Sequence, residues 1–285
     1  MPDAKYTSPD ISRIIGDTFG VHVISNSVNG LTSSTNALPT SDLLYKNEIA
    51  NENVTGVRTL YKFGRNSDIN GAEETIWDEG GLYVYPTSAI QMKVSSSNIN
   101  DTSVGTGART IRVIGLNSLY NEIEEDVTLN GQTEVLTSNT FIRVYRAFVL
   151  TAGSSNTAQG DIYIGTGTVT AGVPATVYAK ITQGENQTLM ALWTVPAGYS
   201  FFLYQVDFTS AISLANTYST TRLKFRPFNS VFRTLYINQL QSGTHVNEIV
   251  IPQFISEKSD IECTAISSGN NNPVSASIAG LYIQN

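Results

Sequence analysis

The sequence predicts an all-β fold made of antiparallel sandwich or jelly-roll-like domains. From about residue 76 onward, short runs of alternating apolar and polar residues follow one another, as strands with one buried face require. Gly, Pro, Asn and Ser separate these runs, and each of these residues favours a turn. No segment of comparable length carries an apolar stripe with a 3.6-residue period, so a helical core is not expected.

The composition supports a packed β protein and argues against several classes of function. The 285 residues suffice for one large domain or two of ordinary size, and 41% of them are hydrophobic. Charged residues make up only 14%, against roughly 25% in an ordinary domain. The net charge of −7 argues against nucleic-acid binding, which needs clustered Lys and Arg. No apolar run approaches the roughly 18 residues that would span a bilayer, so a membrane is not an expected partner.

Residues 1–75 differ from the rest of the chain. They are rich in turn-forming residues and lack sustained periodicity, which predicts an extended N-terminal arm ordered by neighbouring subunits or by the body of the protein. A few short strands folded onto the first domain would give a similar pattern. The run 8–15 carries a weak helix signal, with Ser8 or Asp10 as its cap. The N-terminus lacks the basic and apolar regions of a signal peptide, so synthesis in a cytoplasm is expected.

The first series of strands defines a predicted first β-sandwich domain over residues 76–172. Asn130 and Gly131 follow one of its runs and favour the left-handed dihedrals of a two-residue hairpin turn. The Gly-rich link over 165–173 is the predicted boundary to a second domain. Strands of the first domain are expected over 109–116, 121–129, 140–150 and 160–165.

A second β-sandwich, jelly-roll-like domain is predicted over residues 173–285. Its runs have the short, regular spacing of an antiparallel sandwich or jelly roll. Pro196 and Gly198 lie between two of them, and this pair favours a turn because Pro presets φ and Gly permits a positive φ. One continuous β domain would produce a similar pattern. Strands are expected over 174–181, 187–195, 200–210, 219–228, 231–240, 247–254, 259–267 and 274–283.

Four carboxylates lie close together in the run 121–129 and raise the question of catalysis. Glycoside hydrolysis needs two carboxyl groups that face each other across a cleft in different environments. On one strand these residues would alternate between its two faces, and a solvated strand face explains them more simply. The carboxylates are Glu122, Glu124, Glu125 and Asp126.

A second candidate is the stretch that begins at Asn66. Asp68, Asn70 and Gly71 continue the opening of a calcium loop, with oxygen ligands at alternate positions and glycine at the sharp turn. The pattern then fails, because Trp77 occupies the position where a bidentate carboxylate is needed. No metal site is therefore expected, although Asp68, Asn70 and Glu74 are weak candidate ligands; a turn rich in Asn and Asp is the simpler interpretation.

Other chemistry-bearing residues are sparse. His22 and His245 have no partner at metal-ligand spacing, and the single cysteine, Cys263, lies in an alternating apolar run that predicts a buried thiol. No glycine string completes a nucleotide-binding motif, so no cofactor is expected. We predict that the protein is not an enzyme.

The densest basic group alternates with apolar residues, as the exposed face of a strand does. A local contact to an anion or to a partner is the alternative for this group. Its members are Arg222, Lys224, Arg226 and Arg233.

Longer phrases of the sequence resemble a group of virion structural proteins with jelly-roll-like domains that are common in tailed phages, particularly marine ones. The resemblance covers roughly residues 60–285 and leaves most of the arm unmatched. The phrases that carry it consist of hairpin turns, strand ends and packed aromatics, and they contain no catalytic signature. They include "ETIWDEGGLYVYP", "TSVGTGARTIRVIGLNSLYNEIEEDVTLNG", "FIRVYRAFVLTAGSSNTAQGDI", "NQTLMALWTVPAGYS", "RPFNSVFRTLYI" and "PQFISEKSDIECTAISSGNN".

The resemblance implies a virion structural protein that assembles with other capsid or tail proteins in a particle. A capsid decoration or cement protein that bridges neighbouring subunits is the first choice. A tail, collar or fibre component, including a carbohydrate-binding host-recognition module, is the alternative. A homo-oligomer is expected, and a trimer would be compatible with such β proteins. The predicted partner contacts are Leu43, Leu44 and Tyr45 in the arm and Arg65, Asn66 and Asp68 in the following loop.

Overall fold

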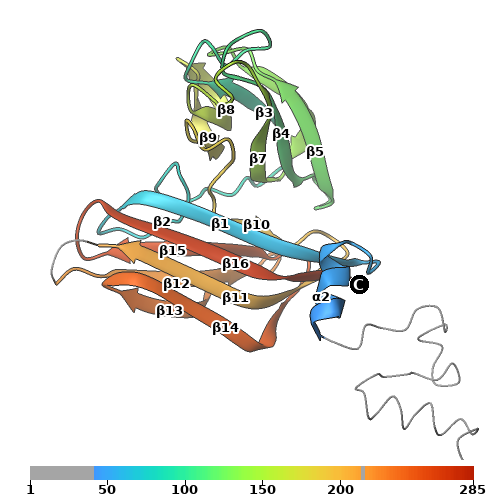
Figure 1. The fold of residues 1–285 in the computed structure, drawn as a ribbon, viewed down its shortest axis with the longest axis vertical. Helices are drawn as coiled ribbons and strands as arrows, with labels where there is room; N and C mark the ends of the chain where they lie inside the picture. The colour runs from blue at the N-terminus through green and yellow to red at the C-terminus, as the bar shows by residue number, and fades with distance from the viewer. Residues whose placement is uncertain (1–41, 213–215) are drawn as a thin grey trace, which may run out of the picture. The chain divides into compact units, whose positions relative to one another are not determined.

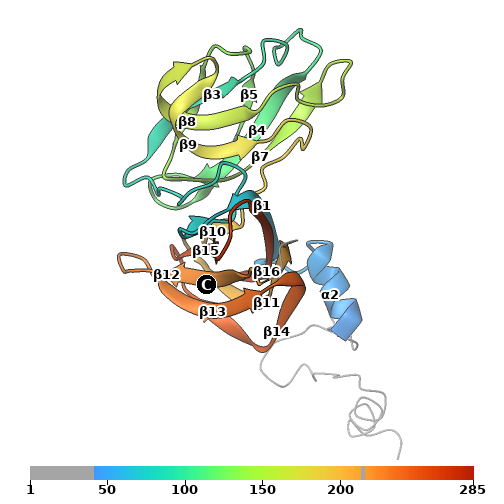
Figure 2. The ribbon, with the colours of Figure 1, turned by 90° about the vertical axis from the view of Figure 1, so that its left-hand side faces the viewer.

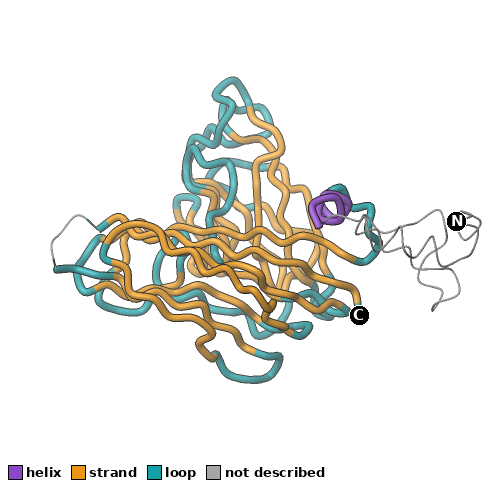
Figure 3. The backbone as a smooth tube through the Cα atoms, turned by 60° about the horizontal axis from the view of Figure 1, so that its bottom comes forward, coloured by secondary structure: helices purple, strands orange, loops and turns teal. Residues whose placement is uncertain are grey.

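The computed structural model describes residues 42–212 and 216–285, and the predicted helix over 8–15 lies outside them. The chain forms two compact units, Met1–Thr59 and Leu60–Asn285. The described part of the first unit contains the helix α2 (Asp42–Ala50). Figure 3 shows that strands make up almost all of the regular structure in the second unit. The all-β prediction is confirmed.

Nine strands form two sheets that face each other as a sandwich. One sheet has the order β1-β16-β11-β14, and the other has the order β10-β15-β12-β13 with β2 beside β15. Figure 1 shows β1, β16, β11 and β14 side by side. The strands are β1 (Val57–Ile69), β2 (Glu74–Thr75), β10 (Leu192–Thr194), β11 (Tyr199–Ala211), β12 (Ser219–Arg226), β13 (Arg233–Leu240), β14 (Ser242–Ile255), β15 (Asp260–Ser267) and β16 (Asn272–Gln284).

The order of these strands is that of a jelly roll. The first strand, β1, lies beside the last, β16, and the pairs β10–β15, β11–β14 and β12–β13 are nested inside this outer pair. Such nesting arises when an antiparallel strand pair folds over on itself as a double Greek key. The predicted turn at Pro196–Gly198, which connects β10 to β11, is confirmed. Gly198 has φ 77°, and the backbone amide of Tyr199 donates a hydrogen bond to the carbonyl of Pro196.

The second strand position of the jelly roll is divided between two distant segments. Both β2 and β10 pair with β15, at Thr264–Ala265 and Asp260–Glu262 respectively. Backbone hydrogen bonds of 2.9 Å join them at the division, from Ile76 to Cys263, from Ala191 to Ile76 and from Cys263 to Ala191. Residues 77–190 are therefore an insertion within a single strand position.

The insertion contains a second sandwich. Its two sheets have the orders β6-β3-β8-β9 and β5-β4-β7 (Figure 2). Its core side chains include Val94, Ile111, Val144 and Ile164, which are fully buried. The strands are β3 (Ile90–Ser96), β4 (Ala108–Leu116), β5 (Glu122–Thr128), β6 (Val135–Phe141), β7 (Arg143–Ala152), β8 (Ile162–Thr170) and β9 (Val173–Ile181).

Two features differ from the expectations for the strand connections. The predicted hairpin turn at Asn130–Gly131 is wrong, because β5 pairs with β4 and the next strand, β6, pairs with β3. Gly131 has φ 62°, but its backbone bonds to Asp101 and Ser96 and so directs the chain to the other sheet. The Gly-rich link over 165–173, predicted as a domain boundary, lies within the β8–β9 hairpin. The chain therefore leaves the sheets of the insertion only after Ile181, where β9 ends.

The described part of the N-terminal stretch, from residue 42 onward, contains regular structure. Val57–Ile69 is the strand β1 of the jelly roll, and Asp42–Ala50 is helical. The change of pattern at residue 76 marks the start of the insertion. Independent folding of domains bounded near 75 and 172 stays a prediction.

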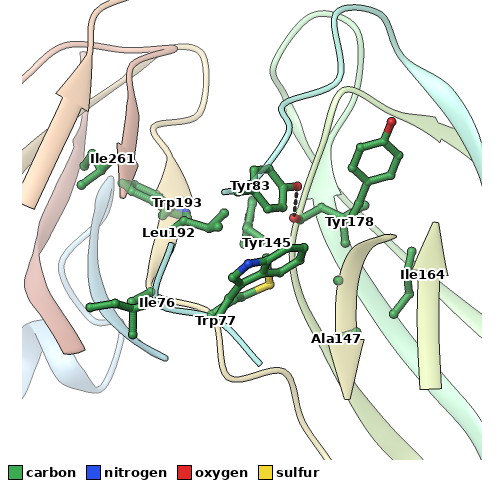
Figure 4. Packing of buried hydrophobic residues seen from close by; sticks show 14 of the residues in the cluster. Ile76, Trp77, Tyr83, Tyr145, Ala147, Ile164, Tyr178, Leu192, Trp193 and Ile261 are labelled. Carbon is green, nitrogen blue, oxygen red and sulfur yellow. Dashed lines mark hydrogen bonds between the residues drawn. The ribbon is translucent and has the colours of Figure 1, made fainter. Parts of the chain in front are cut away.

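Buried aromatic residues connect the insertion to the jelly roll. Trp193 of β10 lies with its ring centroid 6.5 Å from that of Tyr145 of β7, and it also packs against Phe201. The hydroxyl of Tyr83 donates to the carbonyl of Val144 at 3.4 Å (Figure 4). These side chains belong to one continuous buried cluster, so the two sandwiches share core contacts.

Candidate functional site

The strand β14 forms one edge of the jelly roll. It pairs with β11 on its inner side, and no other described strand pairs with its outer side. Exposed edges usually carry lysines, or they are short, because they otherwise recruit other strands. This edge is 14 residues long and contains no Lys or Arg. Pro252 and an irregular register near it interrupt the backbone ladder, so the edge is open to another protein mainly through its side chains.

Four residues of β14, 249–252, bulge out of the register. Leu203 is opposite Gln253 and Gln205 is opposite Glu248, so these four residues lie against Tyr204 alone. We call residues 249–252 the β14 bulge. Val250 and Ile251 within it are 95% and 84% exposed. An apolar protrusion on an unpaired edge is a candidate contact surface for another protein.

A buried ion pair lies between the insertion and the jelly roll. Arg143 of β7 donates from Nε and Nη2 to both carboxylate oxygens of Asp260 of β15, and their side chains are 7% and 4% exposed. Asp260 also accepts from Thr194 at 2.6 Å and from Arg226. One carboxylate thereby connects strands β7, β10, β12 and β15.

Aromatic and acidic groups extend this network. The ring of Tyr85 lies 5.0 Å from the guanidinium of Arg143 and 4.5 Å from that of Arg226, a double cation–π contact. Its hydroxyl donates to Glu262 at 2.9 Å. Burial raises the pKa of Glu262, although the bond from Tyr85 and the charge of Lys224 oppose the rise. The network is thus fixed by both packing and charge.

A pocket of about 250 Å³ opens beside this network. The turn 227–230 forms one wall, and the amide of Ser230 donates to the carbonyl of Pro227 across it. Phe228 is exposed, and its ring makes an edge-to-face contact with Tyr120 at 5.4 Å. The lining residues are Tyr85, Pro86, Thr87, Tyr120, Arg143, Arg226, Pro227, Phe228, Asn229, Ser230, Lys258 and Asp260.

The arrangement suits binding better than proton transfer. Asp260 accepts hydrogen bonds from three different side chains, so its lone pairs are occupied. Arg143 also donates from Nη1 to the carbonyls of Pro86 and Ile142. Among the described residues, no group of three or more His, Cys, Asp or Glu side chains could hold a metal ion.

The weak metal candidates lie together, but they bond within the fold. The Glu74 carboxylate accepts from the Asn66 side chain and from the backbone amides of Asn70 and Gly81. The Asn70 amide group donates to the carbonyl and carboxylate of Asp68. These contacts are those of a loop rich in Asn and Asp that closes on a carboxylate.

The predicted contact residues occupy different surroundings. Leu43, Leu44 and Tyr45 are part of the helix α2, and their side chains lie outside the description. Arg65 is partly exposed and pairs with Asp78 and Glu185. Asn66 is buried and Asp68 is exposed, both on β1. Their role in partner binding stays a proposal.

Three members of the basic group lie on β12 and are more constrained than a solvated strand face, whereas the fourth, Arg233, is exposed on β13 as expected. Arg222 and Lys224 both pair with Glu73, which also accepts from the hydroxyl of Thr264 at 2.8 Å. Partial burial alone would raise the pKa of Glu73, but the Thr264 hydroxyl and the two cations outweigh it and lower this pKa. Arg226 pairs with Asp260. The three residues on β12 therefore contribute to ion pairs, although they were expected on a solvated strand face.

The four carboxylates over 122–126 agree better with the prediction, which was a solvated strand face. Glu124 and Asp126 are exposed on β5 and both pair with Arg112. Glu122 accepts from the hydroxyl of Tyr145 at 2.6 Å. Sequence patterns did not identify Arg143 and Asp260, because nothing local distinguishes them from other charged residues at strand ends.

The comparisons with known proteins add little. No protein-family model and none of the curated proteins matches the sequence. A chain in the structure of the infectious bursal disease virus Gx strain is similar over 80% of this chain and 71% of its own, with 10% identity and a TM-score of 0.23. For the Gt strain these values are 80%, 72%, 11% and 0.22. At such TM-scores the similarity carries no argument about fold or function.

No helix in the described part of the chain is long and apolar enough to cross a membrane.

Proposed function

We propose that this chain is a non-enzymatic structural protein of a virus particle, and that it is a capsid decoration or cement protein that bridges neighbouring subunits. The observation that carries this proposal is the β14 bulge, an apolar protrusion on an unpaired sheet edge. The jelly-roll topology and the sequence resemblance to tailed-phage virion proteins support it, because jelly rolls recur in capsid proteins. Lectins and cupins use the same architecture, so the β14 bulge supports an assembly role more specifically than the jelly-roll fold does.

The proposed occupant of this edge is a second copy of the chain. A two-fold contact would bring the β14 bulges of the two copies together, so that side-chain packing joins the copies where the bulge and Pro252 interrupt the backbone ladder. Val250 and Ile251 would then be removed from water. The ionisable side chains of β14 are His245 and Glu248, so the contact brings few like charges together. A trimeric state stays a separate prediction.

The mechanism is mechanical. The two sandwiches share a buried core, so the unit Leu60–Asn285 can present its surfaces as a firm body. Repetition over a particle would let modest contacts add up to a stable shell, because each later contact forms at high effective concentration. No bond-making step is required.

A tail, collar or fibre component is the second candidate function. The observation that favours it is the pocket beside Arg226 and Phe228, which has the polar and aromatic lining of a ligand site. Host recognition through carbohydrate would use such a pocket.

Sedimentation velocity on the full chain tests the contact. We expect concentration-dependent association of the unchanged protein, and a monomer for the double variant Val250→Asp, Ile251→Asp. The matched control is Val104→Asp, at a position 86% exposed in the insertion, which should associate normally. The β14 contact would be refuted if the unchanged protein were monomeric. It would also be refuted if the double variant associated as strongly as the Val104→Asp control.

A reconstruction of the particle that contains this chain tests the position. We expect density for the jelly roll on the outer capsid surface, with the β14 bulge at a subunit contact. Density in the tail, collar or fibre would support the second candidate, and absence from the particle would refute both.

A further inference from the structure

We propose that the pocket of about 250 Å³ lined by Arg226, Phe228 and Lys258 binds a carboxylate-bearing sugar residue, such as a uronate within a polysaccharide. This inference goes beyond the proposed assembly role and does not depend on it. The pocket and the β14 bulge share no residue.

The charges of the pocket favour an anion. Its lining contains Arg143, Arg226, Lys258 and Asp260, which together carry a net charge of +2, in a chain whose net charge is −7. Asp260 is occupied by its own donors, and Arg143 gives four hydrogen bonds to Asp260 and two carbonyls. The remaining positive charge therefore faces the pocket from Arg226 and Lys258.

These two cations have donors to spare. Arg226 uses Nε and Nη2 on Asp260, and no described residue accepts from its Nη1. The ammonium of Lys258 lies 5.4 Å from the ring of Phe228, and within the described chain it has no acidic partner. A carboxylate that accepts from both would complete the hydrogen bonding of each, and bonds between charged groups are the stronger ones.

The rest of the lining fits a sugar ring. Phe228 is 47% exposed and is steadied by the edge of Tyr120, so it presents an apolar face for the C–H groups of a pyranose. Thr87, Asn229 and Ser230 supply donors and acceptors for hydroxyl groups.

The wall that carries these groups is preorganised. The turn 227–230 is closed by the bond from Ser230 to Pro227, and Asn229 has φ 56°, a conformation that Asn tolerates well. A preformed wall lowers the entropy cost of binding.

The size and charge of the pocket exclude larger anions. Pockets for drug-sized ligands span roughly 300–1,000 Å³, so this one takes about one ring of a chain. A nucleic acid would bring many phosphates to a protein of net charge −7, which opposes it. One carboxylate per ring matches the spare donors of Arg226 and Lys258.

Isothermal titration of the full chain with trigalacturonate tests the proposal, with maltotriose as the neutral comparison and sodium acetate as the free carboxylate. We expect trigalacturonate to bind with a Kd of roughly 1 mM or below, weakened by salt, and the other two to bind at least about tenfold more weakly. Equal binding of maltotriose would refute the charge argument. Equally strong binding of acetate would show that the pocket recognises a carboxylate without the sugar ring.

Variants locate the site. Lys258→Gln should weaken binding about tenfold or more, as loss of a charged hydrogen bond does, and Phe228→Ala about fivefold. Lys93→Gln, which removes a cation paired with Glu134 on the insertion, should leave the affinity unchanged. Unchanged affinity in both pocket variants would overturn the assignment. Both should sediment as the unchanged protein does, so failure here is distinct from failure of the β14 contact.

Discussion

Arg143 and Asp260 form a bidentate ion pair, with Nε 2.8 Å from Oδ1 and Nη2 3.1 Å from Oδ2, although 117 residues separate them in the chain. The pair is buried, and the same carboxylate holds Arg226 and Thr194. Buried charges are tolerated when each is fully paired, and removal of one partner leaves the other desolvated without compensation. This geometry makes Asp260 the more critical member.

Asp260→Asn should destabilise the protein by about 3–5 kcal/mol, because two guanidinium groups lose their counter-charge. Arg143→Met should cost less, because Asp260 keeps Arg226 and Thr194. Urea unfolding followed by fluorescence measures both. Arg112→Met, at an exposed pair, is the control and should change the free energy of unfolding little. A larger loss for Arg143→Met than for Asp260→Asn would contradict the ranking.

Lys62 should make stability depend on pH near neutrality. Burial, reinforced by the charge of Arg146, lowers the pKa of Lys62 from 10.5 to about 7, while its ammonium donates to the carbonyl of Tyr145. Between pH 7 and 10.5 the Lys62 side chain is protonated in the unfolded chain but mostly neutral in the folded protein. The contribution of Lys62 to stability therefore rises with pH over this range, and it is lost as the pH falls through 7.

The variant Lys62→Met removes this dependence. The free energy of unfolding of the variant minus that of the unchanged protein should fall by about 2–3 kcal/mol from pH 6 to pH 9. Urea titrations at several pH values measure it, and the subtraction cancels all other titrating groups. A constant difference across this range would show that Lys62 keeps its ordinary pKa in the folded protein.

Gly64→Ala should destabilise the protein by about 3 kcal/mol or more, because the space beside Gly64 is filled by backbone. An added Cβ would lie 2.2 Å from the amide nitrogen of Ala191 and 2.5 Å from the carbonyl oxygen of Ile76, where the divided strand position joins. Gly71→Ala is a matched control, since no atom lies within 4 Å of its Cβ. Thermal unfolding of both variants checks this. Equal melting temperatures of the two variants would argue against the close approach of the Ala191 and Ile76 backbone to Gly64.

Cys263 should be inert in the native protein. Its side chain is fully buried, and burial together with the charge of Glu262 raises the pKa of the thiol well above its ordinary value. Ellman's reagent should detect no fast-reacting thiol in buffer and one per chain in urea, because only the thiolate reacts. Rapid reaction without denaturant would mean that β15 opens in the native state.

Features that depend on neighbouring residues could be predicted from the sequence. Alternation over 200–210 and 259–267 predicted strands, and the structure has β11 and β15 there. The turn at Pro196–Gly198 and the buried state of Cys263 followed from residue type and local pattern. Period-two alternation reports one buried face wherever the partner strand lies, so such predictions need no knowledge of the partner.

Which strands pair with each other could not be predicted from the sequence and became clear in the folded protein. β1 looked like part of an arm because its partner, β16, lies at the other end of the chain. The joining of Ile76 to Ala191, the ion pair of Arg143 with Asp260 and the exposure of Val250 all depend on contacts between segments far apart in sequence. Strand pairing is formed by backbone groups that every residue carries, so side-chain patterns alone leave the choice of partner open.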